Sequence, residues 1–142
     1  MLDMSAFLEE QPLGYLMYRV VAVLQPKVAA QLQPLGLTLP EFVCLRILSM
    51  APGQSNAELA RHTNVSPQAM NNVLRGLQDK GAVRRPDAVT SGRALPAELT
   101  PQGAALLKRA EAAVLAAEAD VLASLTVDQR RELKRLLAHA VD

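Results

Sequence analysis

The sequence predicts a mainly α-helical fold with one small β-hairpin, and three features lead to this prediction. Half of the 142 residues are hydrophobic but only four are aromatic, so the apolar side chains are mostly Ala, Leu and Val, a composition that favours helices. Five helix-start signals divide the chain. One stretch, residues 82–99, instead resembles two short strands around a turn. The length fits a single domain with a substantial core.

The helix starts are marked by capping residues. Ser or Thr followed three residues later by Glu or Gln, the capping box, occurs at Thr38, Ser55 and Thr126. Ser66 and Thr100 each precede a proline, which is well tolerated at the first helical position. With an earlier helix before them, the predicted helices span about residues 5–33, 39–50, 56–62, 67–80, 101–123 and 127–140.

Prolines and glycines indicate where the first helix is interrupted and ends, and which kind of strands the hairpin has. Pro26 lies inside the first predicted helix and should kink or break it, and Pro34 with Gly36 should end it. The hairpin is expected to pair residues 82–86 with residues 93–99 across a turn at residues 90–92. Pro86 and Pro96 suggest that both are edge strands.

The helix at residues 67–80 has one apolar side and one unusual polar side. Its apolar residues recur at the spacing of a buried stripe: Met70, Val73, Leu74 and Leu77. A solvated face would favour Glu and Lys, but this face carries two asparagines, which are poorer helix formers. In the DNA major groove, Asn and Gln pair with adenine and Arg pairs with guanine. The polar side therefore predicts DNA contact.

The surrounding segments support that prediction. A short helix and a turn at residues 62–65 precede this helix, which is the helix-turn-helix order, and a hairpin directly after it would form the wing. Residues 61–93 contain six basic and two acidic groups, whereas the flanking segments are slightly acidic. Such localised charge suits a polyanion. The alternatives are a structural helix hairpin and a solvated basic patch.

Several classes of protein are disfavoured by what the chain lacks. Cys44 is the single cysteine, so an intrachain disulfide or a Cys-rich zinc site is impossible. No long uncharged apolar run occurs, and the N-terminus lacks the basic start of a signal peptide, so we expect a soluble, cytoplasmic protein. His62 and His139 are isolated, and no phosphate-binding glycine loop is present. We therefore expect no enzyme activity, no cofactor and no metal.

The segments "LTLPEFVCLRILS", "SNAELARHTNVSPQAMNNVLRGLQDKGAVRRP" and "LTPQG" resemble the MarR family of multiple antibiotic resistance regulators. The resemblance covers essentially the whole chain. It implies a homodimeric winged helix-turn-helix regulator, usually a repressor, which small aromatic or phenolic acids such as salicylate release from a pseudo-palindromic DNA operator. It also implies one domain, with dimerisation helices at residues 1–36 and 101–142 and a winged helix-turn-helix at residues 37–100.

The resemblance assigns site residues for DNA. Those implied at the major groove are Ser66, Pro67, Gln68, Asn71, Asn72 and Arg75. Arg93 would reach the minor groove from the wing tip. Ser91 stands where the family usually has an aspartate that braces this arginine, which leaves Arg84 and Arg85 as the expected main phosphate anchors.

A second departure concerns redox sensing. Hydroperoxide-sensing members have a reactive cysteine in the first helix, where this chain has Gly14. Cys44 lies between Val43 and Leu45 in an apolar helix, so we expect a buried, inert thiol rather than a sensor.

The terminal helices predict a partner chain even without the resemblance. Leu107, Val114 and Val121 are spaced by seven residues in a helix more than about 30 Å long. The last helix has its own apolar stripe. A second copy would cover this surface and offer two recognition helices about 34 Å apart; packing within one chain is the alternative.

A ligand site is the least determined expectation. The resemblance implies a pocket between the dimerisation helices and the winged helix. Tyr15, Tyr18 and Arg19 could supply aromatic walls and a cation for a carboxylate, with Arg46 as a further candidate. The tyrosines could equally be interface residues and Arg19 a surface charge. For the whole protein, a winged-helix protein-interaction module without DNA binding remains the alternative function.

Overall fold

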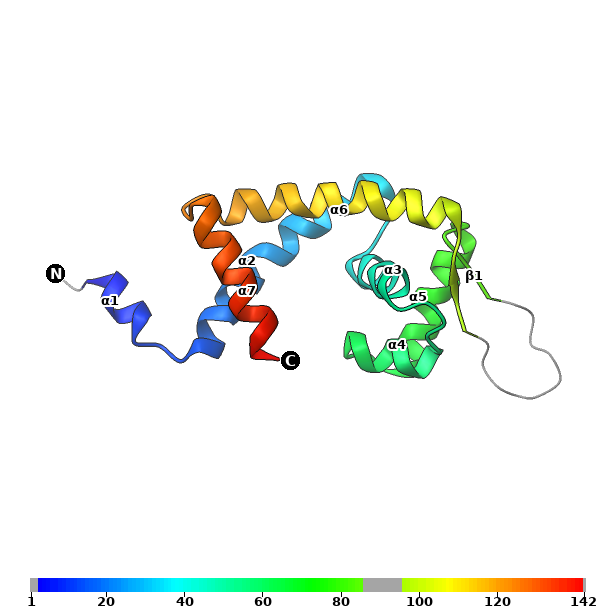
Figure 1. Ribbon diagram of the computed structural model, residues 1–142, viewed down its shortest axis with the longest axis horizontal. Coiled ribbons are helices and arrows are strands. Elements are labelled where there is room, and N and C mark those ends of the chain that lie inside the picture. The colour runs from blue at the N-terminus through cyan, green and yellow to red at the C-terminus, as the bar shows by residue number, and fades with distance from the viewer. Residues whose placement is uncertain (1–2, 86–95, 142) are drawn as a thin grey trace.

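The computed structural model describes residues 3–85 and 96–141, and it is helical apart from one two-stranded hairpin. The elements in chain order are α1 (Met4–Glu9), α2 (Leu13–Leu32), a short 3-10 turn η1 (Gln33–Leu35), α3 (Leu39–Met50), α4 (Asn56–Thr63), α5 (Pro67–Asp79), β1 (Val83–Arg84), β2 (Glu98–Leu99), α6 (Pro101–Val121) and α7 (Val127–Ala140). Figure 1 shows α6 along the top of the view, with α7 folded back from its C-terminal end, α2 running from that end past its middle, and α3, α4, α5 and the hairpin towards its N-terminal end.

The predicted helix starts are confirmed in atomic detail. The side chains of Thr38, Ser55 and Thr126 each accept a hydrogen bond from the backbone N–H three residues later. The Glu or Gln side chain at that later position accepts one from the backbone N–H of the capping residue. Ser66 and Thr100 cap α5 and α6 in front of their prolines. These local bonds satisfy orphan N–H groups at the first turn. The five helices after the first therefore begin and end within two residues of their predicted bounds.

The prediction for the first helix was wrong in one respect. The helix is interrupted at Pro12, whose backbone is extended at φ −55° and ψ 141°, and this interruption separates α1 from α2. Pro26 lies inside α2, which continues to Leu32. Pro26 is exposed, so the carbonyl that loses its helical hydrogen bond there can be solvated. The end of the helix agrees with prediction, since Gly36 follows η1 in the left-handed region at φ 71°.

The hairpin is joined to the start of α6. Its strands pair antiparallel, with Val83 opposite Leu99 and Arg84 opposite Glu98. Thr100 Oγ1 donates to the carbonyl of Gly81 at 2.6 Å. At Gly103 an added Cβ would lie only 2.0 Å from the carbonyl oxygen of Ala82, so this close approach requires glycine. The wing base and α6 therefore pack as one unit.

One hydrophobic core joins α3, α4 and α5 to α6 and to the last turns of α2. Its largest fully buried side chains include Leu45, Leu48, Leu59, Met70 and Leu74. By contrast, neither α1 nor α7 contains a buried residue. Within the described ranges, no helix has the length and apolar character needed to cross a membrane. The core thus belongs mainly to the part of the chain that carries the helix-turn-helix.

Candidate nucleic-acid interface

The helix-turn-helix is formed by α4 and α5. The turn between them uses Asn64 in the left-handed conformation at φ 55°, which asparagine tolerates better than most residues. The side-chain amide of Asn56 donates to the carbonyl of Pro67 at 3.0 Å, which joins the first turns of the two helices. Leu59 and Ala60 are buried on the inner side of α4. These contacts hold α4 and α5 against each other.

The two sides of α5 differ as predicted. Met70, Leu74 and Leu77 are buried, and Val73 is packed against the core. The residues predicted at the major groove lie on the remaining surface: Ser66, Pro67, Gln68, Asn72 and Arg75 are exposed, and Asn71 is half-buried. The structure therefore gathers these six residues on one helix and its N-cap. Their amides and guanidinium match the donors and acceptors of base edges and phosphates.

The three wing arginines have different surroundings. Arg84 is exposed and pairs with Glu98 across the hairpin, with 2.7 Å between Nη2 and Oε2. Arg85 is half-buried and donates from Nη2 to Oδ1 of Asn71 at 3.0 Å. Arg93, like Ser91 beside it, lies outside the described residues. Both described arginines thus make contacts within the chain, which the sequence did not predict.

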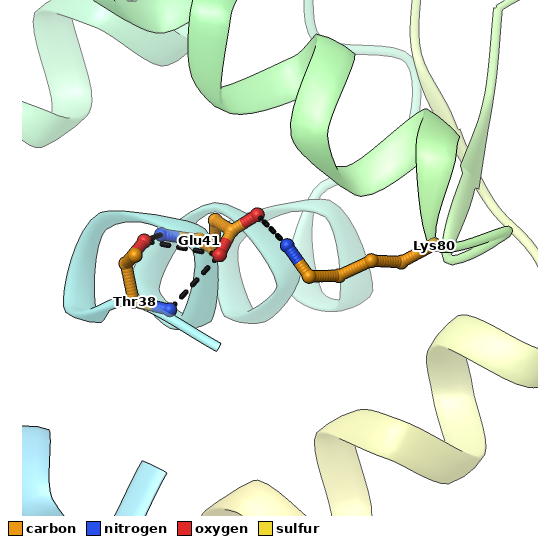
Figure 2. Close-up of polar contacts among 3 residues, drawn as sticks. All are labelled: Thr38, Glu41 and Lys80. Carbon is orange, nitrogen blue, oxygen red and sulfur yellow. Dashed lines mark hydrogen bonds and ion pairs between the residues drawn. The ribbon is translucent and has the colours of Figure 1, made fainter. Parts of the chain in front are cut away.

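An ion pair to a buried carboxylate holds the other end of α5. Figure 2 shows Lys80, directly after α5, reaching Glu41 in the first turn of α3. Lys80 Nζ lies 2.6 Å from Glu41 Oε2, while Oε1 accepts from the backbone and hydroxyl of Thr38. Glu41 is only 5% exposed. Sequence reasoning recognised Glu41 as a capping residue but missed Lys80 as its partner, because the two lie 39 residues apart.

The candidate ligand residues do not form one site within a single chain. Arg46 lines a cavity of about 290 Å³ between α3, α6 and α7, together with Phe42, Glu111, Val114, Leu115, Glu118 and Lys134. Arg46 Nη1 is paired with Glu111 at 2.7 Å. Tyr15, Tyr18 and Arg19 are exposed on α2 and are not part of this lining.

Cys44 is fully buried, as predicted. Burial raises the pKa of its thiol from the usual 9.0 to about 12, and the nearby positive charge of Arg85 opposes this only in part. Such a thiol is protonated at neutral pH and a poor nucleophile. Among the described residues, no group of three or more His, Cys, Asp or Glu side chains is arranged to hold a metal ion.

Comparison with known proteins gives one consistent result. Residues 37–95 match the model of the MarR family. The HTH-type transcriptional repressor Rv2887 of Mycobacterium tuberculosis is 67% identical over 129 residues, which cover 91% of this chain and 93% of that protein.

Solved structures extend the similarity to three dimensions. The complex of Mycobacterium tuberculosis Rv2887 with DNA matches 94% of this chain and 100% of its own at 62% identity, with a TM-score of 0.82. The complex of Rv2887 with salicylic acid matches 92% of this chain and 97% of its own at 66% identity, with a TM-score of 0.77. The winged helix-turn-helix fold predicted from the sequence is thereby confirmed.

Proposed function

Since this chain belongs to the MarR family, we propose that it is a homodimeric, sequence-specific DNA-binding repressor that a small aromatic acid releases from its operator. Its activity is binding rather than catalysis, and its place of action is the cytoplasm. Residues 37–100 contact the DNA, while residues 1–36 and 101–142 form the dimer. The observation that carries the proposal is the exposed amide and arginine face of α5, held by a core that buries the opposite side of the helix.

In this proposal each DNA contact has a separate task. Gln68, Asn71, Asn72 and Arg75 meet base edges in the major groove, and Ser66 and Pro67 bring the α5 N-terminus to a phosphate. Arg84 neutralises phosphate from the wing base. Arg93 is proposed for the minor groove on the family resemblance alone.

Homodimerisation is supported by where apolar surface is left exposed. Among the described residues, Met50 is the only large hydrophobic residue in the 37–100 segment that is exposed. The others belong to α1, α2, α6, α7 or the C-terminal end: Met4, Phe7, Leu13, Tyr15, Met17, Tyr18, Val20, Val21, Val23, Leu115, Val127, Leu136, Leu137 and Val141. Apolar side chains exposed in such number on the terminal helices favour an interface there. A second copy of the chain, packed around a twofold axis, would cover it.

Ligand binding is proposed at the cavity beside Arg46. The cavity combines apolar residues of α3 and α6 with the cations Arg46 and Lys134, as an aromatic carboxylate requires. Glu111 forms an ion pair with Arg46 in the single chain. A bound carboxylate would therefore compete with Glu111 for the Arg46 guanidinium. Tyr15, Tyr18 and Arg19 would complete the pocket from the partner. The salicylic acid complex of Rv2887 supports this class of ligand.

Fluorescence anisotropy with labelled DNA tests the proposal. The protein is titrated against a duplex from upstream of its own gene and against a scrambled duplex, at two salt concentrations, with and without salicylate. We expect tight, salt-dependent preference for the native duplex, and weaker binding when salicylate is present. Equal weak binding to both duplexes would instead favour the alternative, a winged-helix protein-interaction module.

A further inference from the structure

The contact between Arg85 and Asn71 determines how one amide on α5 is oriented. Arg85 Nη2 lies 3.0 Å from Asn71 Oδ1. A guanidinium has only donors, so the atom it meets must be the amide oxygen and not the nitrogen. The Asn71 Nδ2 group therefore points away from Arg85. This hydrogen bond is partly buried, which shields it from competition by water.

Asn72, the next residue, is in a different state. It is exposed on α5, and among the described residues no side-chain hydrogen bond involves it. Its amide can turn so that both its oxygen and its nitrogen face a base. Two neighbouring asparagines thus have different freedom, because only one of them meets the wing.

The difference matters for base recognition. Bidentate reading of adenine uses the amide oxygen to accept from N6 and the amide nitrogen to donate to N7. An asparagine whose oxygen is held by an arginine offers mainly its N–H groups. The major-groove edges that present only acceptors as polar groups are guanine, with O6 and N7, and thymine, with O4.

We infer that Arg85 is a positioning residue that presents Asn71 to DNA as a hydrogen-bond donor, so that Asn71 selects guanine or thymine and Asn72 is the amide free to pair with adenine. This inference rests on the proposed function. It also changes the role expected for Arg85, which is half-buried against α5 rather than extended toward a phosphate. Arg84, which is exposed, remains suited to the phosphate role.

The first arm of the test uses the free protein and no DNA. In an NMR spectrum of ¹⁵N-labelled protein, the Asn71 side-chain amide pair is identified by its loss in Asn71→Asp. In Arg85→Met, this pair should shift while the pairs of Gln68 and Asn72 stay in place. In Arg85→Lys, which keeps a donor, the Asn71 pair should lie closer to its wild-type position than it does in Arg85→Met. If the Asn71 side-chain signals keep their wild-type positions in Arg85→Met, the inference is overturned.

The second arm selects binding sites from a randomised duplex and sequences them. Arg85→Met should alter base frequencies at the same position in each half-site that Asn71→Ala alters, with adenine gaining there because the amide oxygen is released. Its salt dependence should match that of the wild type. The matched control, Arg84→Met, should leave base frequencies unchanged and reduce the log–log salt slope by about one.

Two outcomes of the second arm would contradict the inference. Arg85→Met could behave like Arg84→Met, weakening all sequences alike with a shallower salt slope, and Arg85 would then be a phosphate anchor. If the wild type enriched no sequence at all, the proposed function would fail. The role of Arg85 and Asn71 in base recognition would then fail as well. The wild-type selection distinguishes the two cases, because it tests the proposed function without any substitution. The NMR arm reports the contact between Arg85 and Asn71 without DNA.

Discussion

Lys80 Nζ and Glu41 Oε2 lie 2.6 Å apart, so an ion pair connects the C-terminal end of α5 to the first turn of α3. The Glu41 side chain is 6% exposed and that of Lys80 is 34% exposed. The same carboxylate caps α3 through Thr38. One buried charge therefore serves two helices, and its loss or the loss of its partner should affect both.

Replacing Lys80 by Met should destabilise the protein. The substitution leaves the Glu41 carboxylate buried without a counter-charge, and we expect a loss of about 1–3 kcal/mol in the free energy of unfolding, because Lys80 is only partly buried. Urea denaturation at fixed protein concentration measures this. Arg84→Met, which breaks the exposed pair with Glu98, is the control and should cost less than about 1 kcal/mol. Equal losses would mean that the burial of Glu41 has no energetic effect.

Gly103 should not tolerate a methyl group. Ala is normally better than Gly inside a helix by about 1 kcal/mol. Here its Cβ would clash with the backbone carbonyl of Ala82, and we expect Gly103→Ala to lower stability by about 1–3 kcal/mol. Ala104→Gly, at the exposed neighbouring position, should cost about 1 kcal/mol through propensity alone. Thermal unfolding compares them, and a stabilised Gly103→Ala would refute the close approach.

Arg75 and Arg84 should differ in their effects on DNA binding. If Arg75 reads a guanine, Arg75→Ala should cost about 1–3 kcal/mol on the preferred duplex and relax sequence preference. Arg84→Ala should weaken binding to every duplex and flatten the salt dependence. Glu98→Gln, which releases Arg84 from its ion pair, should strengthen binding to all sequences. Anisotropy on specific and random duplexes tests all three, and identical profiles for Arg75→Ala and Arg84→Ala would disprove the division of roles.

Cys44 should make stability fall at high pH. Its pKa is about 12 in the fold and near the usual 9.0 when unfolded, so only the unfolded thiol ionises between these values. The stability that the neutral thiol contributes is complete below about pH 9 and is lost as the pH rises toward 12. Urea denaturation of the wild type and of Cys44→Ala from pH 8 to pH 10.5 should show a steeper decline for the wild type. Parallel curves would argue against burial of the thiol.

Leu136 should contribute to the dimer. It is exposed on α7, which contains no buried residue, and burial of a leucine is worth about 1.5–3 kcal/mol. Leu136→Gln should therefore raise the dimer dissociation constant by about tenfold or more. Sedimentation velocity across a dilution series measures this constant. Met50→Gln, at an exposed site on α3, should leave it unchanged; an unaffected Leu136→Gln would remove α7 from the interface.

The features that were predictable from the sequence are those produced by neighbouring residues. Thr38, Ser55 and Thr126 cap helices through atoms three residues away, and the stripe from Met70 to Leu77 follows helical spacing. The prediction placed the interruption of the first helix at Pro26, but it lies at Pro12, and α2 continues through Pro26 to Leu32.

Contacts between distant segments were also beyond prediction. The pairing of Lys80 with Glu41 and of Arg85 with Asn71 depends on how α3, α5 and the wing pack together. Sequence spacing predicts which face of α5 is polar, but not which of its amides is already occupied.

The geometry of α6 has a mechanical consequence. Its first turn is locked to the wing base through Gly103, and its far end lies beside α2 and α7 (Figure 1). It therefore acts as a lever arm between the two ends of the molecule. Over its 21 residues, about 30 Å at the helical rise, a tilt of about 5° displaces the far end by roughly 2–3 Å. In the proposed dimer, a small rotation at that far end would move the wing end of α6 relative to the DNA by a comparable distance.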